Sequence, residues 1–192
     1  GMKVVLVYNV RSGGRYDARR LKAAFRRHGL DVTYSFTIGQ LSSKKLSALV
    51  HRGVTVAVVG GDGTLNAAAR LLAGSASIML PLPGGTFNHF VRDLGMPLTV
   101  DDILSNIGSA RVRRIDVAYV NDELFLNNSN LGLYPFSLIE RKAASRLLGK
   151  WAAAVLSALD QLGRFRRHRL VIDGERLRSP FVFIGNNVFD IR

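Results

Sequence analysis

Four residues in the first third of the chain have the types and spacing of a phosphate site. Gly60, Gly61, Asp62 and Gly63 follow the apolar run Thr55–Val59, which has the length of one buried strand. Glycines after a buried strand let a ligand approach backbone N–H groups at the carboxyl edge of a parallel sheet, near a positive helix end. An anion repels phosphate unless a metal ion lies between them. We therefore expect Asp62 to take part in a Mg²⁺–nucleotide site, the alternative being a simple tight turn.

A helix is expected to follow this turn and to complete a unit of strand, glycine turn and helix. Thr64 is predicted to be its N-cap, because a threonine side chain can accept a backbone N–H bond there. Leu65, Ala68 and Leu72 repeat at helical spacing after it. Gly74 is predicted to close the helix as its C′ residue.

Strands and helices alternate through the first half of the chain. Sequence patterns predict strands at Lys3–Tyr8, Asp31–Thr37 and Ile78–Leu82, and helices at Asp17–His28 and Ser42–His51. This order predicts a parallel α/β sheet with helices on both faces. Two further glycine turns, at positions 9–14 and 83–86, follow the first and fourth strands, and the second of them leads to a short helix near Asn88.

The character of the sequence changes after about residue 117. Four strands and one helix are predicted from here on: Arg111–Val120, Glu123–Asn128, Lys150–Leu162 (the helix), His168–Ile172 and Pro180–Asn186. We therefore expect an α/β nucleotide-binding domain over residues 1–117. The beginning of a mostly-β second domain, apparently truncated, is expected over residues 118–192.

The charge balance predicts an anionic partner. The 192 residues include 27 Lys and Arg against 14 Asp and Glu, a net charge of +13, which suits nucleic acid, a phospholipid surface or a polyphosphate. Basic clusters at Arg141-Lys142, Arg146, Lys150 and Arg164–Arg169 suit an anionic membrane at about 1 kcal/mol per residue, or form only a solvated face. The chain lacks cysteine, and we expect a cytoplasmic protein with peripheral membrane association.

Six motifs occur in order along the chain: Asn9–Gly13 (NVRSG), Gly60–Asn66 (GGDGTLN), Leu82–Asn88 (LPGGTFN), Leu94-Gly95, Arg114–Val117 (RIDV) and Asp173–Glu175 (DGE). Together they resemble the diacylglycerol kinase catalytic domain family of bacterial lipid kinases, over the whole chain. The resemblance implies a two-domain enzyme with an ATP cleft. Such a kinase transfers the γ-phosphoryl group of ATP to a lipid hydroxyl, such as that of diacylglycerol, with Mg²⁺.

The resemblance also implies the residues of the site. Nucleotide contacts are expected from Asn9, Ser12, Gly13, Thr37, Gly60, Gly61, Asp62, Gly63, Thr64, Leu65, Asn66, Gly85 and Thr86. Asp62 and Asp116 are implied as the catalytic acidic residues that hold Mg²⁺ or its waters, although Asp116 could instead pair with Arg113 or Arg114. This set suits phosphoryl transfer, which depends mainly on positioning and charge neutralisation.

Three departures from the family pattern stand out. Val10 and His89 occupy positions where the family usually has proline and aspartate. The family also continues past a strand like Phe181–Asn187 to a later acidic residue, the catalytic base, which we expect beyond residue 192. The chain is therefore expected to bind Mg²⁺–ATP weakly, to phosphorylate no lipid by itself and to self-associate, for example as a homodimer. The acceptor lipid is not readable from the sequence.

Other functions explain part of the pattern. A non-catalytic nucleotide or lipid-binding module fits the presence of His89, and a soluble-substrate kinase of the NAD kinase type also uses a Gly-Gly-Asp-Gly turn. A nucleic-acid-binding module would explain the charge. It would leave the glycine turns unexplained, so no nucleic-acid partner is expected.

Overall fold

The computed structural model describes residues 1–10, 17–132, 168–172, 174–179 and 181–186. Its contacts divide the chain into two units, Gly1–Asn127 and Asn128–Gly185, and Asn186 belongs to the first. The domain boundary at residue 117 stays a prediction, because contacts alone do not define a domain. The site residues considered below lie in the first unit.

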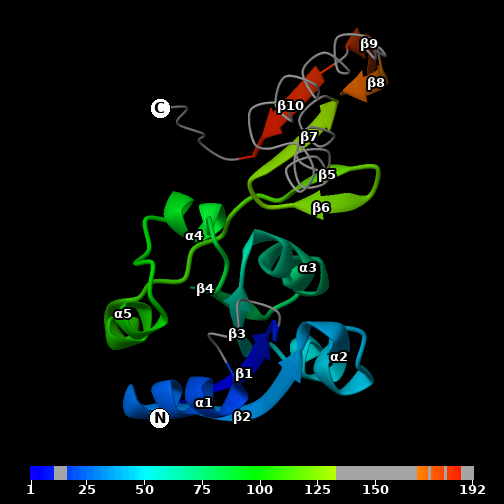
Figure 1. The fold of residues 1–192 in the computed structure, drawn as a ribbon. Helices are drawn as coiled ribbons and strands as arrows, with labels where there is room; N and C mark the ends of the chain where they lie inside the picture. Colours follow the sequence, from blue (N-terminus) through cyan, green and yellow to red (C-terminus); the bar gives the residue numbers. More distant parts are fainter. Residues whose placement is uncertain (11–16, 133–167, 173, 180, 187–192) are drawn as a thin grey trace, which may run out of the picture. The chain divides into compact units, whose positions relative to one another are not determined.

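Four parallel strands form the centre of the first unit (Figure 1). They are β1 (Met2–Tyr8), β2 (Leu30–Thr37), β3 (Thr55–Gly60) and β4 (Ile78–Pro83), in the spatial order β2-β1-β3-β4. Every neighbouring pair is parallel, so the four carboxyl ends lie at the same edge of the sheet. The α/β sheet predicted from the sequence is confirmed.

Helices cover the two faces of this sheet: α1 (Ala18–Arg27), α2 (Lys44–His51), α3 (Asp62–Leu72), α4 (His89–Asp93) and α5 (Val100–Ser105). Right-handed crossovers with this strand order place α1 on one face and the next two helices on the other. In agreement, α1 contacts α5 while α2 contacts α3 (Figure 1). Short 3₁₀ turns, η1 (Ile38–Gln40) and η2 (Ile107–Ser109), follow β2 and α5.

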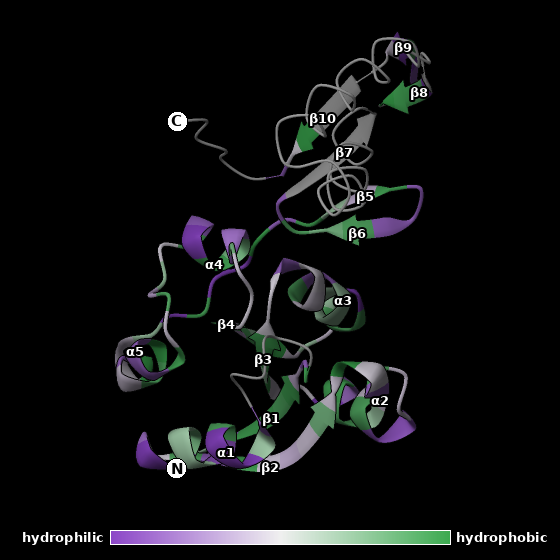
Figure 2. Ribbon diagram, viewed as in Figure 1, coloured by the Kyte–Doolittle hydropathy of each residue, from purple (hydrophilic) through white to green (hydrophobic). Residues whose placement is uncertain are grey.

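The core lies between the sheet and these helices. Val4–Val7 of β1 and Val56–Val59 of β3 are almost fully buried, and the hydrophobic colour of these strands contrasts with the hydrophilic stretches of α1 (Figure 2). Leu21 and Phe25 of α1 pack into the same core. Full burial of one such side chain stabilises the fold by about 1.5–3 kcal/mol.

The predicted helix ends in this half are largely confirmed. The Asp17 side chain accepts the Arg20 N–H at 2.7 Å and caps α1. Gly29, with φ 76°, follows the C-cap of α1. Gly74, with φ 73°, takes the C′ position after α3 as predicted. A left-handed backbone at C′ is the reason why glycine ends both helices.

A short antiparallel hairpin ends the first unit. β5 (Ala118–Val120) pairs with β6 (Glu123–Phe125), and Asn121 and Asp122 between them have φ 47° and 64°. Two left-handed residues of this type form the expected hairpin turn. The strand predicted over Arg111–Val120 is wrong for its first part, because residues 111–117 belong to no strand. Their alternation of basic and apolar residues imitates a strand pattern.

The second unit contains two antiparallel pairs. β7 (Asn128–Gly132) pairs with β10 (Phe181–Gly185), and β8 (His168–Ile172) pairs with β9 (Glu175–Ser179). The strand predicted at 180–186 thus has a partner, β7, which lies earlier in the chain. The predicted helix Lys150–Leu162, and most of the basic clusters predicted to meet a membrane, lie outside the described residues. In the described ranges no helix has the length and apolar character needed to span a bilayer.

Candidate functional site

The turns after β1 and β3 lie side by side at the carboxyl edge of the sheet. With the strand order β2-β1-β3-β4, the connections leave β1 and β3 in opposite directions, which is where open α/β sheets bind ligands. The Asn9 N–H donates to the Val59 carbonyl at 3.2 Å, and Asn9 Nδ2 donates to Thr64 Oγ1 at 3.2 Å. These bonds bring together two of the predicted nucleotide-contacting turns.

Four glycines let the turns after β3 and β4 touch backbone to backbone. Gly84 N–H donates to the Gly60 carbonyl at 3.0 Å. A Cβ on Gly84 would lie 2.8 Å from Gly60 Cα, and one on Gly85 would lie 2.5 Å from Gly61 Cα. Real Cβ atoms do not approach backbone so closely. Packing between the two turns is therefore sufficient reason for Gly84 and Gly85, while a Cβ on Gly60 would instead lie 2.4 Å from the Cβ of Thr64 in α3.

Gly63 has no such packing reason. It is exposed in the first turn of α3, and a Cβ placed on it would meet nothing within 4 Å. Glycine inside a helix costs about 1 kcal/mol relative to alanine. A close-approaching ligand such as a phosphate would give it a role, since the first N–H groups of a helix have no intrahelical partner.

The start of α3 differs from the prediction. The helix begins at Asp62 with Gly61 as its N-cap, so the prediction of Thr64 as N-cap is wrong. The N–H groups of Thr64 and Leu65 both donate to the Gly61 carbonyl, at 2.9 and 3.1 Å. Thr64 is instead buried in the first turn, where its hydroxyl accepts the Asn9 amide. Glycine can serve as N-cap because the cap needs only an extended backbone. The strand before it ends at Gly60, one residue beyond the apolar run.

The Asp62 side chain connects the turn after β3 to the start of α4, which follows the turn after β4. Its Oδ1 accepts the Phe90 N–H at 3.0 Å, and its Oδ2 accepts the His89 N–H at 3.2 Å. A carboxylate is a favourable partner for the free N–H groups and the positive end of α4. Asp62 therefore caps the start of another helix, a role that the sequence alone did not reveal.

Asn88 closes the loop that follows β4, and sequence reasoning missed this role. Its Oδ1 accepts the Gly85 N–H at 2.9 Å, and its Nδ2 donates to the Gly85 carbonyl at 3.0 Å. Its φ of 51° is left-handed, and asparagine tolerates that region better than most residues. The loop exposes the predicted site residue Thr86, and also Phe87 and His89, whose rings stack with centroids 5.5 Å apart.

The other predicted site residues lie in different surroundings. Thr37 ends β2, and its N–H and Oγ1 both donate to Gln40 Oε1, at 2.9 and 3.3 Å. Asn66 Oδ1 accepts the Leu126 N–H at 3.0 Å, and the Leu65 side chain is fully buried. The predicted residues Ser12 and Gly13 lie outside the described residues.

Asp116 is exposed in the segment before β5. Its backbone carbonyl accepts Asn186 Nδ2 at 3.0 Å. The alternative reading, an ion pair with Arg113 or Arg114, does not occur between these described residues. The metal role of Asp116 stays a prediction.

The donor set suits a metal ion that arrives with a nucleotide. Within the described ranges, no three His, Cys, Asp or Glu residues lie close enough to hold a metal by themselves. Mg²⁺ in kinases is usually bound by one or two carboxylates together with phosphate oxygens and waters. Each Asp62 oxygen accepts one N–H bond, and a carboxylate has about four acceptor sites. Asp62 thus retains the capacity to bind such an ion.

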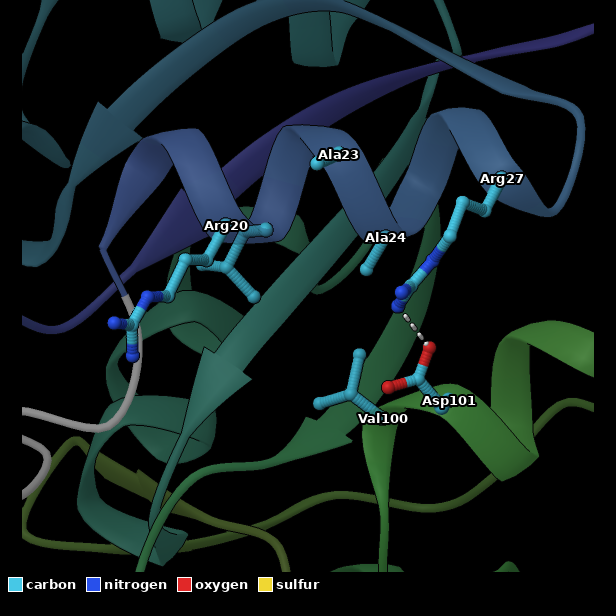
Figure 3. Close-up of a pocket in the computed structure, with 7 residues that line it drawn as sticks. Arg20, Ala23, Ala24, Arg27, Val100 and Asp101 are labelled. Atoms are coloured by element: carbon cyan, nitrogen blue, oxygen red, sulfur yellow. Dashed lines mark hydrogen bonds and ion pairs between the residues drawn. The ribbon is translucent and has the colours of Figure 1, made fainter.

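A hollow of about 350 Å³ lies elsewhere, between α1 and α5 (Figure 3). Seven residues line it, none of which is a predicted site residue: Arg20, Leu21, Ala23, Ala24, Arg27, Val100 and Asp101. Arg27 Nη2 and Asp101 Oδ1 pair across it at 2.7 Å, with side chains 65% and 60% exposed. Exposed pairs of this kind stabilise a fold by at most about 1 kcal/mol. The glycine turns remain the candidate site.

A parallel sheet with helices on both faces and glycine turns at its carboxyl edge is the α/β fold of diacylglycerol kinase-type kinases. The diacylglycerol kinase catalytic domain family matches residues 3–120. The chain belongs to this family.

Relatives and a solved structure agree with this assignment. A Pectobacterium atrosepticum protein named "Probable lipid kinase YegS-like" is 28% identical over 177 residues, which cover 88% of this chain and 59% of the relative. A Pseudomonas putida protein of the same name is 33% identical over 137 residues, covering 69% and 46%. The crystal structure of a diacylglycerol kinase from Bacillus anthracis matches with a TM-score of 0.61 and 25% identity, over 96% of this chain and 66% of that one. The chain thus spans about half to two thirds of the length of these proteins.

Proposed function

We propose that this protein is an ATP-dependent lipid kinase that transfers the γ-phosphoryl group of Mg²⁺–ATP to a lipid hydroxyl, such as that of diacylglycerol. Family membership supports the reaction class. The observation that carries the nucleotide site is the open space over Gly63, beside the N–H groups at the start of α3. That glycine is unfavourable for the helix and favourable for a close-approaching phosphate.

Each part of the site has a separate task in this proposal. Backbone N–H groups of the first turn of α3, at Asp62 and Gly63, would bind phosphate oxygens. Asp62 would fix the position of the start of α4 through its hydrogen bonds to His89 and Phe90. It would also bind Mg²⁺, with Asp116 as the second carboxylate. The ion supplies neutralisation of the charge on the β- and γ-phosphate oxygens. Binding and orientation are thus the contributions of these residues.

The transfer itself is a simple exchange of bonds. The acceptor oxygen forms a bond to the γ-phosphorus while the bond from that phosphorus to the β–γ bridging oxygen breaks. ADP leaves, and the hydroxyl proton passes to a general base, which we do not assign among the described residues. Positioning of the two oxygens in line, rather than covalent catalysis, is the main requirement.

Thin-layer analysis of lipids tests the proposal. The intact protein, as the cell makes it, is incubated with Mg²⁺, γ-labelled ATP and vesicles that contain diacylglycerol, and separately with a total lipid extract. We expect label in a lipid phosphate, with Arg27→Gln in the α1–α5 hollow as an unaffected control. Label only in water-soluble acceptors would favour a soluble-substrate kinase. Nucleotide binding without any transfer would favour a non-catalytic module, and either result would overturn the proposal.

A further inference from the structure

The segment Arg111–Ile115 exposes apolar and basic side chains together. It lies between η2 and β5, belongs to no helix or strand, and all five of its residues are exposed. Val112 is 70% and Ile115 is 38% exposed. Leaving large apolar side chains in water forgoes the stabilisation that burial would give. Two exposed apolar side chains in five residues, beside three arginines, suggest a surface that binds another molecule.

The three arginines of this segment are not neutralised by the part of the chain that the structure describes. Some arginines elsewhere have partners: Arg27 pairs with Asp101, Arg70 pairs with Glu123, and Arg92 Nε donates to the Phe87 carbonyl. Others among the described residues, such as Arg19 and Arg26 on α1, have none. No ion pair or hydrogen bond of a described residue engages the guanidinium groups of residues 111, 113 and 114. Their charge adds to an overall excess of +13. The segment therefore attracts an anionic partner.

We propose that Arg111–Ile115 is a docking segment that binds the surface of a bilayer containing anionic phospholipids. Such a surface offers phosphates to the arginines and an apolar layer to Val112 and Ile115. A free phosphate would leave the two apolar side chains exposed. Nucleic acid would account for the charge, but this segment lacks the aromatic side chains on which bases stack.

The position of the segment in the chain suits the proposed function, on which this step rests. Ile115 is followed directly by Asp116, whose carbonyl is held by Asn186 Nδ2. At no more than about 3.6 Å per residue, Arg111 lies within roughly 18 Å of Asp116. A lipid hydroxyl stays at the bilayer surface, so a docking segment next to the site would bring the site to its acceptor.

Co-sedimentation with vesicles tests the docking segment. Phosphatidylcholine vesicles with and without phosphatidylserine are mixed with the wild-type chain, with R111Q/R113Q/R114Q and with V112S/I115S. Each arginine near an anionic surface strengthens binding about fivefold, so the triple variant should bind roughly 100-fold more weakly. The apolar variant should also bind more weakly, including at high salt, where charges are screened.

A matched control removes the same charge elsewhere. Arg19, Lys22 and Arg26 are exposed on α1, and R19Q/K22Q/R26Q should weaken vesicle binding no more than a few-fold. An equal loss in this control and in the segment variant would show that only net charge matters, and would overturn the proposal. Absence of wild-type binding to anionic vesicles, or full binding by V112S/I115S, would do the same. Far-UV circular dichroism and urea unfolding check that each variant folds.

The outcome is separable from that of the proposed function. Phosphorylation of a short-chain diacylglycerol dispersed in water does not need a bilayer, so the segment variants of the intact protein should retain it. If vesicle binding depends on the segment but the protein phosphorylates no lipid, the proposed function is wrong and the docking proposal stands. Lipid phosphorylation with no effect of the segment variants on vesicle binding would do the reverse.

Discussion

Replacing Asp62 with alanine is expected to lower the free energy of unfolding by about 2 kcal/mol and to remove the effect of Mg²⁺ on ATP binding. The variant leaves the N–H groups of His89 and Phe90 without their acceptor. Hydrogen bonds to a charged group contribute about 1.5–3 kcal/mol each. The half-buried position of Asp62 reduces that contribution, since water can replace part of it. Urea unfolding measures the first effect, and titration with a fluorescent ATP analogue measures the second.

Asp62→Asn separates the two roles of this side chain. The asparagine oxygen can still accept one N–H bond, while its NH₂ group faces the other donor, so about half of the stability loss should remain. The negative charge is gone, so the affinity gained from Mg²⁺ should disappear. From the sequence alone, this variant would be expected to fold as well as the wild type. The hydrogen bonds of Asp62 to the start of α4 are the reason why we expect Asp62→Asn to be less stable than the wild type.

Asp31→Asn is the matched control, because it removes one exposed carboxylate from β2 at no predicted site position. It should change neither the urea midpoint nor the effect of Mg²⁺. If Asp62→Asn still gains as much affinity from Mg²⁺ as the wild type, the metal role is wrong. If Asp62→Ala unfolds at the wild-type urea concentration, the capping role is wrong.

Alanine at Gly63 and at Gly85 should have opposite effects on stability. Gly63→Ala places its methyl group in open space within a helix, so the free energy of unfolding should stay unchanged or rise by up to about 1 kcal/mol. The same methyl group would occupy the approach of a phosphate, and ATP affinity should fall at least about tenfold. Gly85→Ala would place its Cβ 2.5 Å from Gly61 Cα, and should destabilise the fold by about 1–3 kcal/mol.

Gly108→Ala serves as the control for this pair. A Cβ on Gly108 also meets nothing within 4 Å, but the residue lies in η2, at no predicted site position. Thermal or urea unfolding and ATP titration of the three variants form one data set. Full ATP affinity in Gly63→Ala would show that the open face over this glycine does not meet the nucleotide.

Local sequence patterns predicted the elements that are defined by local physics. Apolar runs identified β1, β3 and β4, and helical spacing identified α1 and α3, because burial of one face repeats with the period of each element. α5 was not predicted, although Thr99 accepts the Asp102 N–H as its N-cap. Its six residues are too few for a periodic signal. Residues 111–117 were predicted as a strand because alternation alone cannot show whether a pairing partner exists.

The candidate site was predictable by residue type, but the tasks of its residues were not. The glycine turn after β3 is readable from its own sequence. The partners of Asp62 lie 27 and 28 residues further along the chain, so its capping role depends on which turns the sheet brings together. The same is true of Gly85, whose lack of a side chain matters because Gly61 lies against it.

Calorimetric titration of the chain with ATP, ADP, AMP and adenosine, each with and without Mg²⁺, tests the central claim most directly. If the turn after β3 binds phosphates at the start of α3, affinity should rise with each phosphate, and Mg²⁺ should strengthen the binding of ATP most. AMP and adenosine should bind weakly and without regard to Mg²⁺. Equal affinity for adenosine and ATP, or no binding of ATP at all, would contradict a triphosphate site at the glycine turns.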